Sequence, residues 1–469
     1  MRGLTVALCG AALLLTAGCA PDPEPGPSPA PSSPAPSSPA PSSDDGLVTW
    51  VTEVEALYGE PTGAELLASV DGTGEETWLI GTGDTWIALT GVTGADEPAA
   101  AAVHVHGLQA GSGAALWSRE LDGALCADQL LGGSLFCASV VEFDTGTGEG
   151  SRWRLHLIDP ETGEDRATAE IDGWVSAVHV TAGTIVLLEQ PEMEESVRLR
   201  GFAPDLTEAW TLDLAGRDGV SRFFPSADDS RSSPSPVRPT RWTGPMLERI
   251  SLDGFGPDGG VLAAGAGAGA ALVDVTSGDL LALPACVTLA DDGERLWCNR
   301  GGRHFEVSSW TYAGEREVQA EHVEMISARA RPVFADRDGH LVTVDAETGE
   351  VGPAYGEPVD SAWAYTTASD RETYTLVTTA FDGSGLALLG PDADEVVWRT
   401  DDLPELSTAF PPYVHDGRIV LGGGEDLLLL SPETGEVVES HQVPAAQTLP
   451  VGDGIAGVSS YAVAALDLR

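Results

Sequence analysis

One ten-residue phrase occurs three times in this chain, and it constrains the fold more than any other feature. It reads LHLIDPETGE at residues 155–164, LVTVDAETGE at 341–350 and LLLLSPETGE at 427–436. In each copy an apolar stretch leads into Asp or Ser and then into a turn that ends in glycine, which adopts positive φ without steric cost. Self-similarity of this kind is typical of repeat architectures, in which each repeat is one supersecondary unit.

Weaker versions of the phrase raise the number of strand-turn-strand signals to eight; they lie at residues 107–117, 201–210, 272–281, 309–318 and 386–398. Most neighbours are about 35 to 50 residues apart, which is the length of one propeller blade. Short apolar runs and Gly/Asp turns fill the intervals. We therefore expect an all-β fold, a β-propeller of four-stranded blades, with eight blades and seven as the alternative.

The repeats resemble the PQQ-like repeats of quinoprotein-type β-propellers, whose pattern is an apolar strand, Asp, a Thr-Gly turn and Trp four residues after the Gly. Gly113 and Trp117 have this spacing. The three clearest turns carry other residues at that place, namely Ala167, Pro353 and Glu439. The resemblance covers most of residues 75–469 and implies a fold more specifically than an activity.

The same resemblance implies how the ring closes and what its tryptophans do. Propellers of this type usually complete the last blade with strands from both ends of the chain. We expect residues 459–469 to supply the final strand and to pair with residues 78–89. The regularly placed Trp side chains are expected to pack between neighbouring blades, where their large area is best buried.

The N-terminus has the features of an export signal. Arg2 precedes an apolar stretch, residues 4–15, that is too short to span a bilayer. Thr16-Ala17-Gly18-Cys19 resembles a bacterial lipobox, with Thr16 where Leu is usual. The resemblance implies a signal peptide at residues 1–18, cleavage before Cys19 and a diacylglycerol on its sulfur. An ordinary secretory signal with an incidental Cys is the alternative.

A Pro/Ser/Ala-rich linker follows, at residues 19–46, with a composition that favours extended polyproline II and cannot build a core. The propeller domain is expected to occupy residues 47–469. This organisation predicts a protein at the cell membrane, anchored only by its lipid and facing the extracytoplasmic side.

Four cysteines remain once those of the signal and the lipid site are set aside: Cys126, Cys137, Cys286 and Cys298. We expect Cys286 to lie directly opposite Cys298 across a hairpin whose loop is residues 291–293, close enough for a disulfide. Cys126 and Cys137 flank a Gly-Gly turn that misses the ideal register by about one residue, so their disulfide needs a bulge. Four separate thiols are the alternative, and the spacing disfavours a zinc site.

Charge limits the class of partner. The chain has 73 acidic and 24 basic residues, for a net charge of -49. Such a surface repels phosphate, so no nucleic-acid partner is expected. It also disfavours direct contact with anionic lipid headgroups, which suits a domain held away on a linker.

Catalytic motifs are sparse. The chain contains no nucleophile elbow, phosphate-binding loop or zincin motif. It also lacks the vicinal Cys-Cys pair of methanol-dehydrogenase-like quinoproteins. His104-Val105-His106 places two imidazoles on one face of a strand, but no third ligand is visible. We expect no catalytic set, no cofactor and no metal. The favoured function is a non-catalytic binding or scaffolding module for a protein, peptide or glycan; a PQQ- or metal-dependent oxidoreductase and an extracytoplasmic ligand sensor are the alternatives.

A long polar insertion at residues 217–241 is the candidate partner-contact loop, since long loops in compact domains are commonly functional. It concentrates arginine and phenylalanine in a chain poor in both: Arg217, Arg222, Phe223, Phe224, Arg231, Arg238 and Arg241. An exposed surface loop without a partner is the alternative.

Overall fold

The structure is a computed structural model. It describes residues 47–59, 62–67, 79–92, 102–143, 150–181, 183–189, 197–214, 251–256, 259–266, 269–282, 284–286, 288–300, 305–326, 331–359, 364–368, 373–379, 385–391, 393–401, 403, 412–423, 426–443, 445 and 447–468. The predicted signal peptide, Cys19, the linker and the insertion at 217–241 lie outside the described residues. No helix in the described segments has the length and apolarity needed to cross a membrane.

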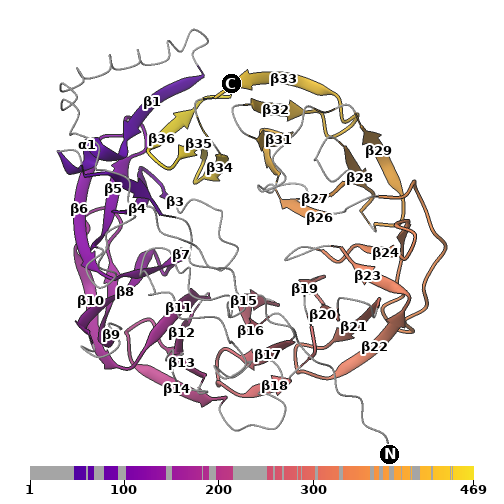
Figure 1. Ribbon diagram of the computed structural model, residues 1–469, viewed down its shortest axis with the longest axis horizontal. Coiled ribbons are helices and arrows are strands. Elements are labelled where there is room, and N and C mark those ends of the chain that lie inside the picture. The colour runs from indigo at the N-terminus through magenta and orange to yellow at the C-terminus, as the bar shows by residue number, and fades with distance from the viewer. Residues whose placement is uncertain are drawn as a thin grey trace, which may run out of the picture. The chain divides into compact units, whose positions relative to one another are not determined.

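The described strands form nine antiparallel sheets, which follow one another around a ring (Figure 1). We number these blades in chain order. Blade 1 contains β2 (Ala64–Leu66), β3 (Leu79–Thr82), β4 (Thr85–Val92), β5 (Ala102–Gln109) and β6 (Ala115–Asp122). Blade 2 contains β7 (Leu125–Leu131), β8 (Ser134–Phe143), β9 (Gly150–Ile158) and β10 (Asp165–Asp172). Blade 3 contains β11 (Val175–Val180), β12 (Ile185–Glu189), β13 (Arg198–Phe202) and β14 (Glu208–Asp213).

The next blades repeat this plan. Blade 4 contains β15 (Ser251–Phe255), β16 (Val261–Ala266), β17 (Gly269–Asp274) and β18 (Leu280–Ala282). Blade 5 contains β19 (Thr288–Asp291), β20 (Leu296–Asn299), β21 (Glu306–Trp310) and β22 (Arg316–Glu321), and blade 6 contains β23 (Val323–Met325), β24 (Phe334–Asp336) and β25 (Leu341–Val342). Blade 7 contains β26 (Ala364–Ala368), β27 (Thr373–Thr378), β28 (Leu386–Leu389) and β29 (Val396–Thr400). Blade 8 contains β30 (Tyr413–His415), β31 (Arg418–Gly423), β32 (Asp426–Leu430) and β33 (Val437–Gln442).

Blade 9 joins the two ends of the described chain. It contains β34 (Gln447–Val451), β35 (Gly454–Ser459), β36 (Ala462–Leu466) and β1 (Val48–Glu53), and α1 (Val54–Tyr58) follows β1. β1 pairs with β36 as the outermost strand. Closure by strands from both ends is therefore confirmed, but the expected partner of β36 was wrong. Residues 79–89 belong to the first hairpin of blade 1, whereas the Val-Thr-Trp run of β1 supplies the missing fourth strand.

The all-β propeller with four-stranded blades is confirmed, but the count of eight blades, and of seven, was wrong: the structure has nine. Seven of the eight sequence signals fall at the turn between the last two strands of one blade, and the eighth follows β25 of the three-stranded blade 6, where only isolated bridges stand in for a fourth strand. The ninth blade has no such turn, because its fourth strand comes from the other end of the chain. A count of turns is therefore one less than the count of blades.

The turns of blades 2, 4, 6 and 8 share one hydrogen-bond pattern, which explains the repeated phrase. In blade 2, Asp159 Oδ1 accepts hydrogen bonds from the backbone N–H groups of Glu161 and Thr162, at 2.8 and 3.2 Å. Ser431 accepts the equivalent bonds with its hydroxyl in blade 8. Gly163 then closes the turn with φ 72°, where other residues would be strained. Asp, or Ser in its place, thus stabilises the turn in these four blades, whereas Gln109 occupies the equivalent position in blade 1.

Tryptophans of the outer strands seal several of the boundaries between blades, as predicted. Trp117 of blade 1 donates its indole N–H to the carbonyl of Pro160 in the blade 2 turn, at 3.0 Å. Its ring lies so close to Gly163 that a Cβ there would approach ring carbons to 2.6 Å. Pro160 is the second residue of its turn, and three other tryptophans donate to the carbonyl at that position in a neighbouring blade. They are Trp50 to Ala110, Trp210 to Val275 and Trp398 to Pro432.

Both predicted disulfides are present. Cys126 lies directly opposite Cys137, with a Cα–Cα distance of 4.1 Å, and the ladder shifts register just beyond the pair, as the need for a bulge predicted. Cys286 is bonded to Cys298 at a Cα–Cα distance of 5.3 Å. The expected register of this second hairpin was wrong, because Cys298 pairs with Leu289 in the ladder.

The physical cause lies in the turn of that hairpin. Asp292 Oδ1 accepts hydrogen bonds from the backbone N–H groups of Glu294 and Arg295, at 2.9 and 2.8 Å. The turn therefore closes over four residues after Asp291, which pairs with Leu296. Cys286 lies before the strand and bonds from outside the ladder.

Candidate functional site

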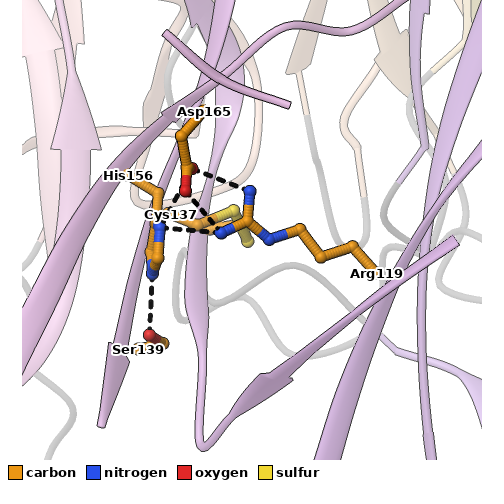
Figure 2. Close-up of a disulfide and its surroundings, with 6 residues drawn as sticks. Arg119, Cys137, Ser139, His156 and Asp165 are labelled. Atoms are coloured by element: carbon orange, nitrogen blue, oxygen red, sulfur yellow. Dashed lines mark hydrogen bonds and ion pairs between the residues drawn. A yellow bond between two sulfur atoms is a disulfide. The ribbon is translucent and has the colours of Figure 1, made fainter. Parts of the chain in front are cut away.

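Four polar side chains meet at the boundary between blades 1 and 2, beside the Cys126–Cys137 disulfide (Figure 2). Ser139 Oγ lies 2.9 Å from His156 Nε2, and His156 Nδ1 lies 3.1 Å from Asp165 Oδ1. The order Ser-His-Asp and these distances match those of a hydrolytic triad. This cluster is therefore the candidate functional site among the described residues, and its burial and charges decide whether it could act as a triad.

Strand register explains how the three residues of blade 2 reach one face. His156 of β9 lies opposite Cys137 of β8, and Ser139 is two residues further along β8, so its side chain points the same way. A β-bulge at Arg166 places Asp165 of β10 directly opposite Ile158, which shares the face of His156. Without that extra residue, the carboxylate would point to the other face.

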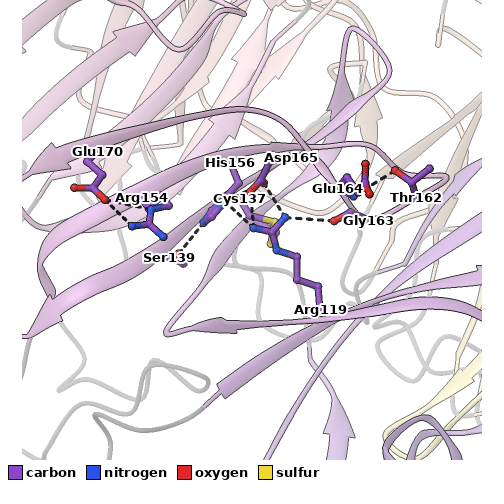
Figure 3. A network of polar contacts seen from close by, with 11 residues as sticks. Arg119, Cys137, Ser139, Arg154, His156, Thr162, Gly163, Glu164, Asp165 and Glu170 are labelled. Atoms are coloured by element: carbon purple, nitrogen blue, oxygen red, sulfur yellow. Dashed lines mark hydrogen bonds and ion pairs between the residues drawn. A yellow bond between two sulfur atoms is a disulfide. The ribbon is translucent and has the colours of Figure 1, made fainter.

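Arg119 of β6 joins this group from blade 1. Its guanidinium donates to both carboxylate oxygens of Asp165, at 2.7 and 2.8 Å. The same group lies 3.1 Å from His156 Nδ1 and donates to the carbonyl of Gly163 at 3.3 Å. Figure 3 also shows a separate ion pair near this cluster, in which Arg154 binds Glu170 at 2.6 Å.

Burial and charge set the protonation of the cluster. His156 is 3% exposed, and burial is the main cause that lowers its pKa, with the neighbouring Arg119 charge acting in the same direction and Asp165 opposing it. Burial alone would raise the pKa of Asp165, but the hydrogen bonds and charges of Arg119 and His156 together outweigh it and lower that pKa. At neutral pH the cluster therefore holds a neutral imidazole and an ionised carboxylate.

The chemistry open to this arrangement is limited by Arg119 and by burial. A bidentate guanidinium neutralises the carboxylate that would have to stabilise an imidazolium. Ser139, at 6% exposure, offers little surface to a substrate. What the four groups do directly is connect the outer strand of blade 1 to three strands of blade 2.

The two histidines of the His-x-His motif also lie together, as expected. The rings of His104 and His106 on β5 are stacked with centroids 5.9 Å apart, and Tyr58 of α1 packs edge-on against both. His106 Nε2 lies 2.8 Å from the hydroxyl of Thr90, which lies 2.6 Å from that of Tyr58. Burial, followed by the charge of His104, lowers the pKa of His106 to about 4. Within the described segments, no group of three potential metal ligands is present.

Sequence reasoning missed the blade 1–2 cluster entirely. Arg119, Ser139, His156 and Asp165 form no motif along the chain. Asp165 joins the face of Ser139 and His156 only through a bulge, and Arg119 reaches it only across a blade boundary. The predicted partner-contact residues of the insertion, Arg217 to Arg241, and the predicted lipidation site Cys19 lie outside the described residues.

The fold and its sites define a nine-bladed β-propeller with a buried polar cluster between its first two blades. No family model and no curated protein matches the sequence. Among solved structures, BamB from Moraxella catarrhalis is similar over 83% of this chain and 96% of its own, at 12% identity and a TM-score of 0.44. The computationally designed Ika8 protein covers 90% of this chain and 100% of its own, at 11% identity and 0.44. A quinohemoprotein alcohol dehydrogenase from Comamonas testosteroni covers 86% and 76%, at 11% and 0.38.

Proposed function

We propose that the protein is a lipid-anchored β-propeller on the extracytoplasmic side of the cell membrane, which binds or scaffolds a protein, peptide or glycan partner without catalysing a reaction. Cys19 would carry the lipid and the Pro/Ser/Ala-rich linker would hold the propeller away from the bilayer. The observation that carries the proposal is the position of β1. The strand that directly follows the linker is built into the last blade, so a tether would hold a closed ring at its rim.

The proposed partner-contact insertion joins the ring at the opposite face. In blade 9, Leu47 lies at the end that carries the first hairpin turn of the blade, because Val48 pairs with Leu466, which also pairs with Ile455. In blade 3, β14 finishes at the other end, where Asp213 pairs with Arg198. Because the blades repeat with one orientation around the ring, Leu47 and Asp213 lie at opposite ends of their strands.

The test is a cross-linked pull-down of the lipidated protein from its own envelope, read by mass spectrometry. A matched variant replaces the five Arg of the insertion by Ser, which keeps the loop length and removes its charge. A reproducible partner that is lost with this variant supports the proposal. Cys19→Ser should move the protein from the membrane fraction to the soluble fraction. Reduction of a dye by protein reconstituted with PQQ and calcium would overturn the non-catalytic assignment.

A further inference from the structure

The outer strand of blade 8 presents a different surface from the outer strands of blades 2 and 5. On β33 the exposed residues are all uncharged: Val437, Val438, Ser440 and Gln442. On β10 and β22 the exposed residues are mostly charged: Asp165, Arg166, Thr168, Glu170 and Asp172 on the former, and Arg316, Glu317, Gln319 and Glu321 on the latter. Charges on an edge strand prevent another strand from adding to it, so β10 and β22 are protected and β33 is not.

The same contrast occurs at one equivalent position. Val438 is the bulged residue of β33, since Leu429 pairs with Glu439 and Leu430 with Val437. Its side chain is 53% exposed. The bulge of blade 2 holds Arg166 and that of blade 5 contains Glu317. One backbone position therefore carries charge in one part of the ring and an exposed apolar side chain in another.

The hydrogen-bonding groups of this edge point outward. β33 is the last strand of the sheet β30-β31-β32-β33, and none of the described strands pairs with its outer side. Alternate N–H and C=O groups of such a strand face away from the sheet. The two ionisable residues of β33, Glu439 and His441, are partly exposed and bind each other at 3.2 Å, and Glu439 also binds Arg418 at 2.6 Å. An extended peptide would thus meet free backbone groups and uncharged side chains.

Charge around the edge selects the partner. Glu433 and Glu436 are exposed in the turn that leads into β33, and the whole chain has a net charge of -49. We propose that the outer edge of β33 accepts an extended segment of a basic protein as a fifth strand of blade 8. The segment would be uncharged where it crosses β33 and basic at its ends. The proposal deepens the proposed binding function and does not depend on the insertion.

The probe is a synthetic peptide of alternating Thr and Val with Arg at both ends. We expect it to bind the full protein, to bind more weakly as salt rises, and to slow hydrogen exchange at alternate backbone amides of residues 437–442. Two control peptides separate the contributions. One has Glu in place of Arg, and the other is N-methylated at alternate residues, which blocks ladder hydrogen bonds; both should lose at least tenfold in affinity.

Variants of the protein locate the site. Val438→Glu gives β33 the protection that Glu317 gives β22 and should weaken peptide binding at least tenfold. Ala209→Glu is the matched control, because Ala209 occupies the same bulge in blade 3. Unchanged thermal unfolding of both variants shows that the fold is intact.

Several results would overturn the proposal. Equal losses with Val438→Glu and Ala209→Glu would mean that added negative charge alone acts. Binding of the N-methylated peptide without loss would exclude strand addition. Self-association, or sedimentation with neutral lipid vesicles, that Val438→Glu abolishes would assign the edge to a second copy or to a membrane. Failure of the pull-down test with normal peptide binding would overturn only the role of the insertion.

Discussion

At two blade boundaries, a turn carbonyl of one blade accepts a hydrogen bond from the preceding blade, but the donors differ. These are the boundary between blades 1 and 2 and the boundary between blades 5 and 6. In the first, the indole of Trp117 binds the Pro160 carbonyl and covers Gly163. In the second, a guanidinium takes the place of the indole, and Arg295 donates to the carbonyl of Ala346 at 2.7 Å. The accepting carbonyl is the equivalent one in both turns. What recurs between blades is therefore an acceptor that must be satisfied, while the donor is free to vary.

The two donors differ in how much apolar surface they cover. Trp117 packs on glycine atoms of two blades, Gly107 and Gly163. The Arg295 side chain is 17% exposed and also contacts Glu317 at 3.4 Å. An indole stabilises mainly by burial and a guanidinium mainly by charge-assisted hydrogen bonds. The Trp117 contact should therefore depend little on salt, and the Arg295 contact more.

The largest expected effect is the loss of the indole. Trp117→Ala should lower the free energy of unfolding by about 3 kcal/mol, because it removes apolar area and leaves a cavity between two blades. Trp117→Phe keeps most of the area and loses only the hydrogen bond, so its cost should be about 1 kcal/mol. Chemical denaturation measures both. Equal costs would mean that the hydrogen bond, and not the packing, seals this boundary.

The next effect depends on pH. The folded pKa of His106 is about 4 and the ordinary value is 6.5. The unfolded chain therefore binds more protons between these values, and stability should fall as pH decreases through that window, by about 3 kcal/mol in total. His106→Gln should flatten this part of the stability profile relative to wild type. An unchanged slope between pH 6.5 and 4 would contradict the burial of a neutral imidazole.

Loss of the guanidinium between blades 5 and 6 comes next. Arg295→Met keeps much of the aliphatic length and removes the bond to Ala346, so the free energy of unfolding should fall by about 1 to 2 kcal/mol. The matched comparison is Trp117→Phe, which removes the equivalent bond elsewhere. If added salt lowers the free energy of unfolding of wild type and of Arg295→Met by the same amount, the positive charge of Arg295 does not stabilise this boundary.

The blade 1–2 cluster gives a spectroscopic test. Arg119→Met should raise the pKa of His156, since the guanidinium charge lowers it in the wild type and Asp165 raises it. Proton titration by NMR of the His156 ring measures the change. An unchanged or lower pKa would show that Arg119 does not govern this imidazole.

The smallest effect is expected at the surface of the same cluster. Arg154→Ala removes the pair with Glu170, in which both side chains are nearly half exposed. Exposed pairs of this kind contribute little to stability, because solvent screens their charges. A cost as large as that of Arg119→Ala, measured side by side, would mean that Arg154 is part of the buried network.

The sequence predicted the blades through their turns, and this explains both its success and its one miscount. Turn chemistry is local, so Asp159 and Ser431 with their glycines are readable from residues alone. Blade 9 has no such turn because β1 comes from the other end of the chain, and pairing over that separation leaves no local mark. Blade 6 shows the converse. Its repeat phrase is a clear one, yet Pro353, at the place of the tryptophan, cannot donate a ladder hydrogen bond. The fourth strand is reduced to two isolated bridges, Val344 to Val351 and Leu341 to Tyr355.

The candidate site was beyond sequence reasoning for a related cause. The disulfides could be predicted because each pair flanks its own hairpin. The Ser139–His156–Asp165 alignment depends on a bulge at Arg166, and Arg119 reaches it across a blade boundary. The spacing of residues along one strand predicts neither the bulge nor the contact across the blade boundary.

β1 closes the ring as the outer strand of a ninth blade, and a cysteine cross-link tests this closure most directly. Val51 and Ala464 are paired across β1 and β36. In the double variant Val51→Cys, Ala464→Cys, we expect a disulfide between these two positions, identified by mass spectrometry of the non-reduced protein. A matched pair, Ala464→Cys with Ile80→Cys, should form none. A cross-link in the second variant and not in the first would contradict the nine-bladed closure.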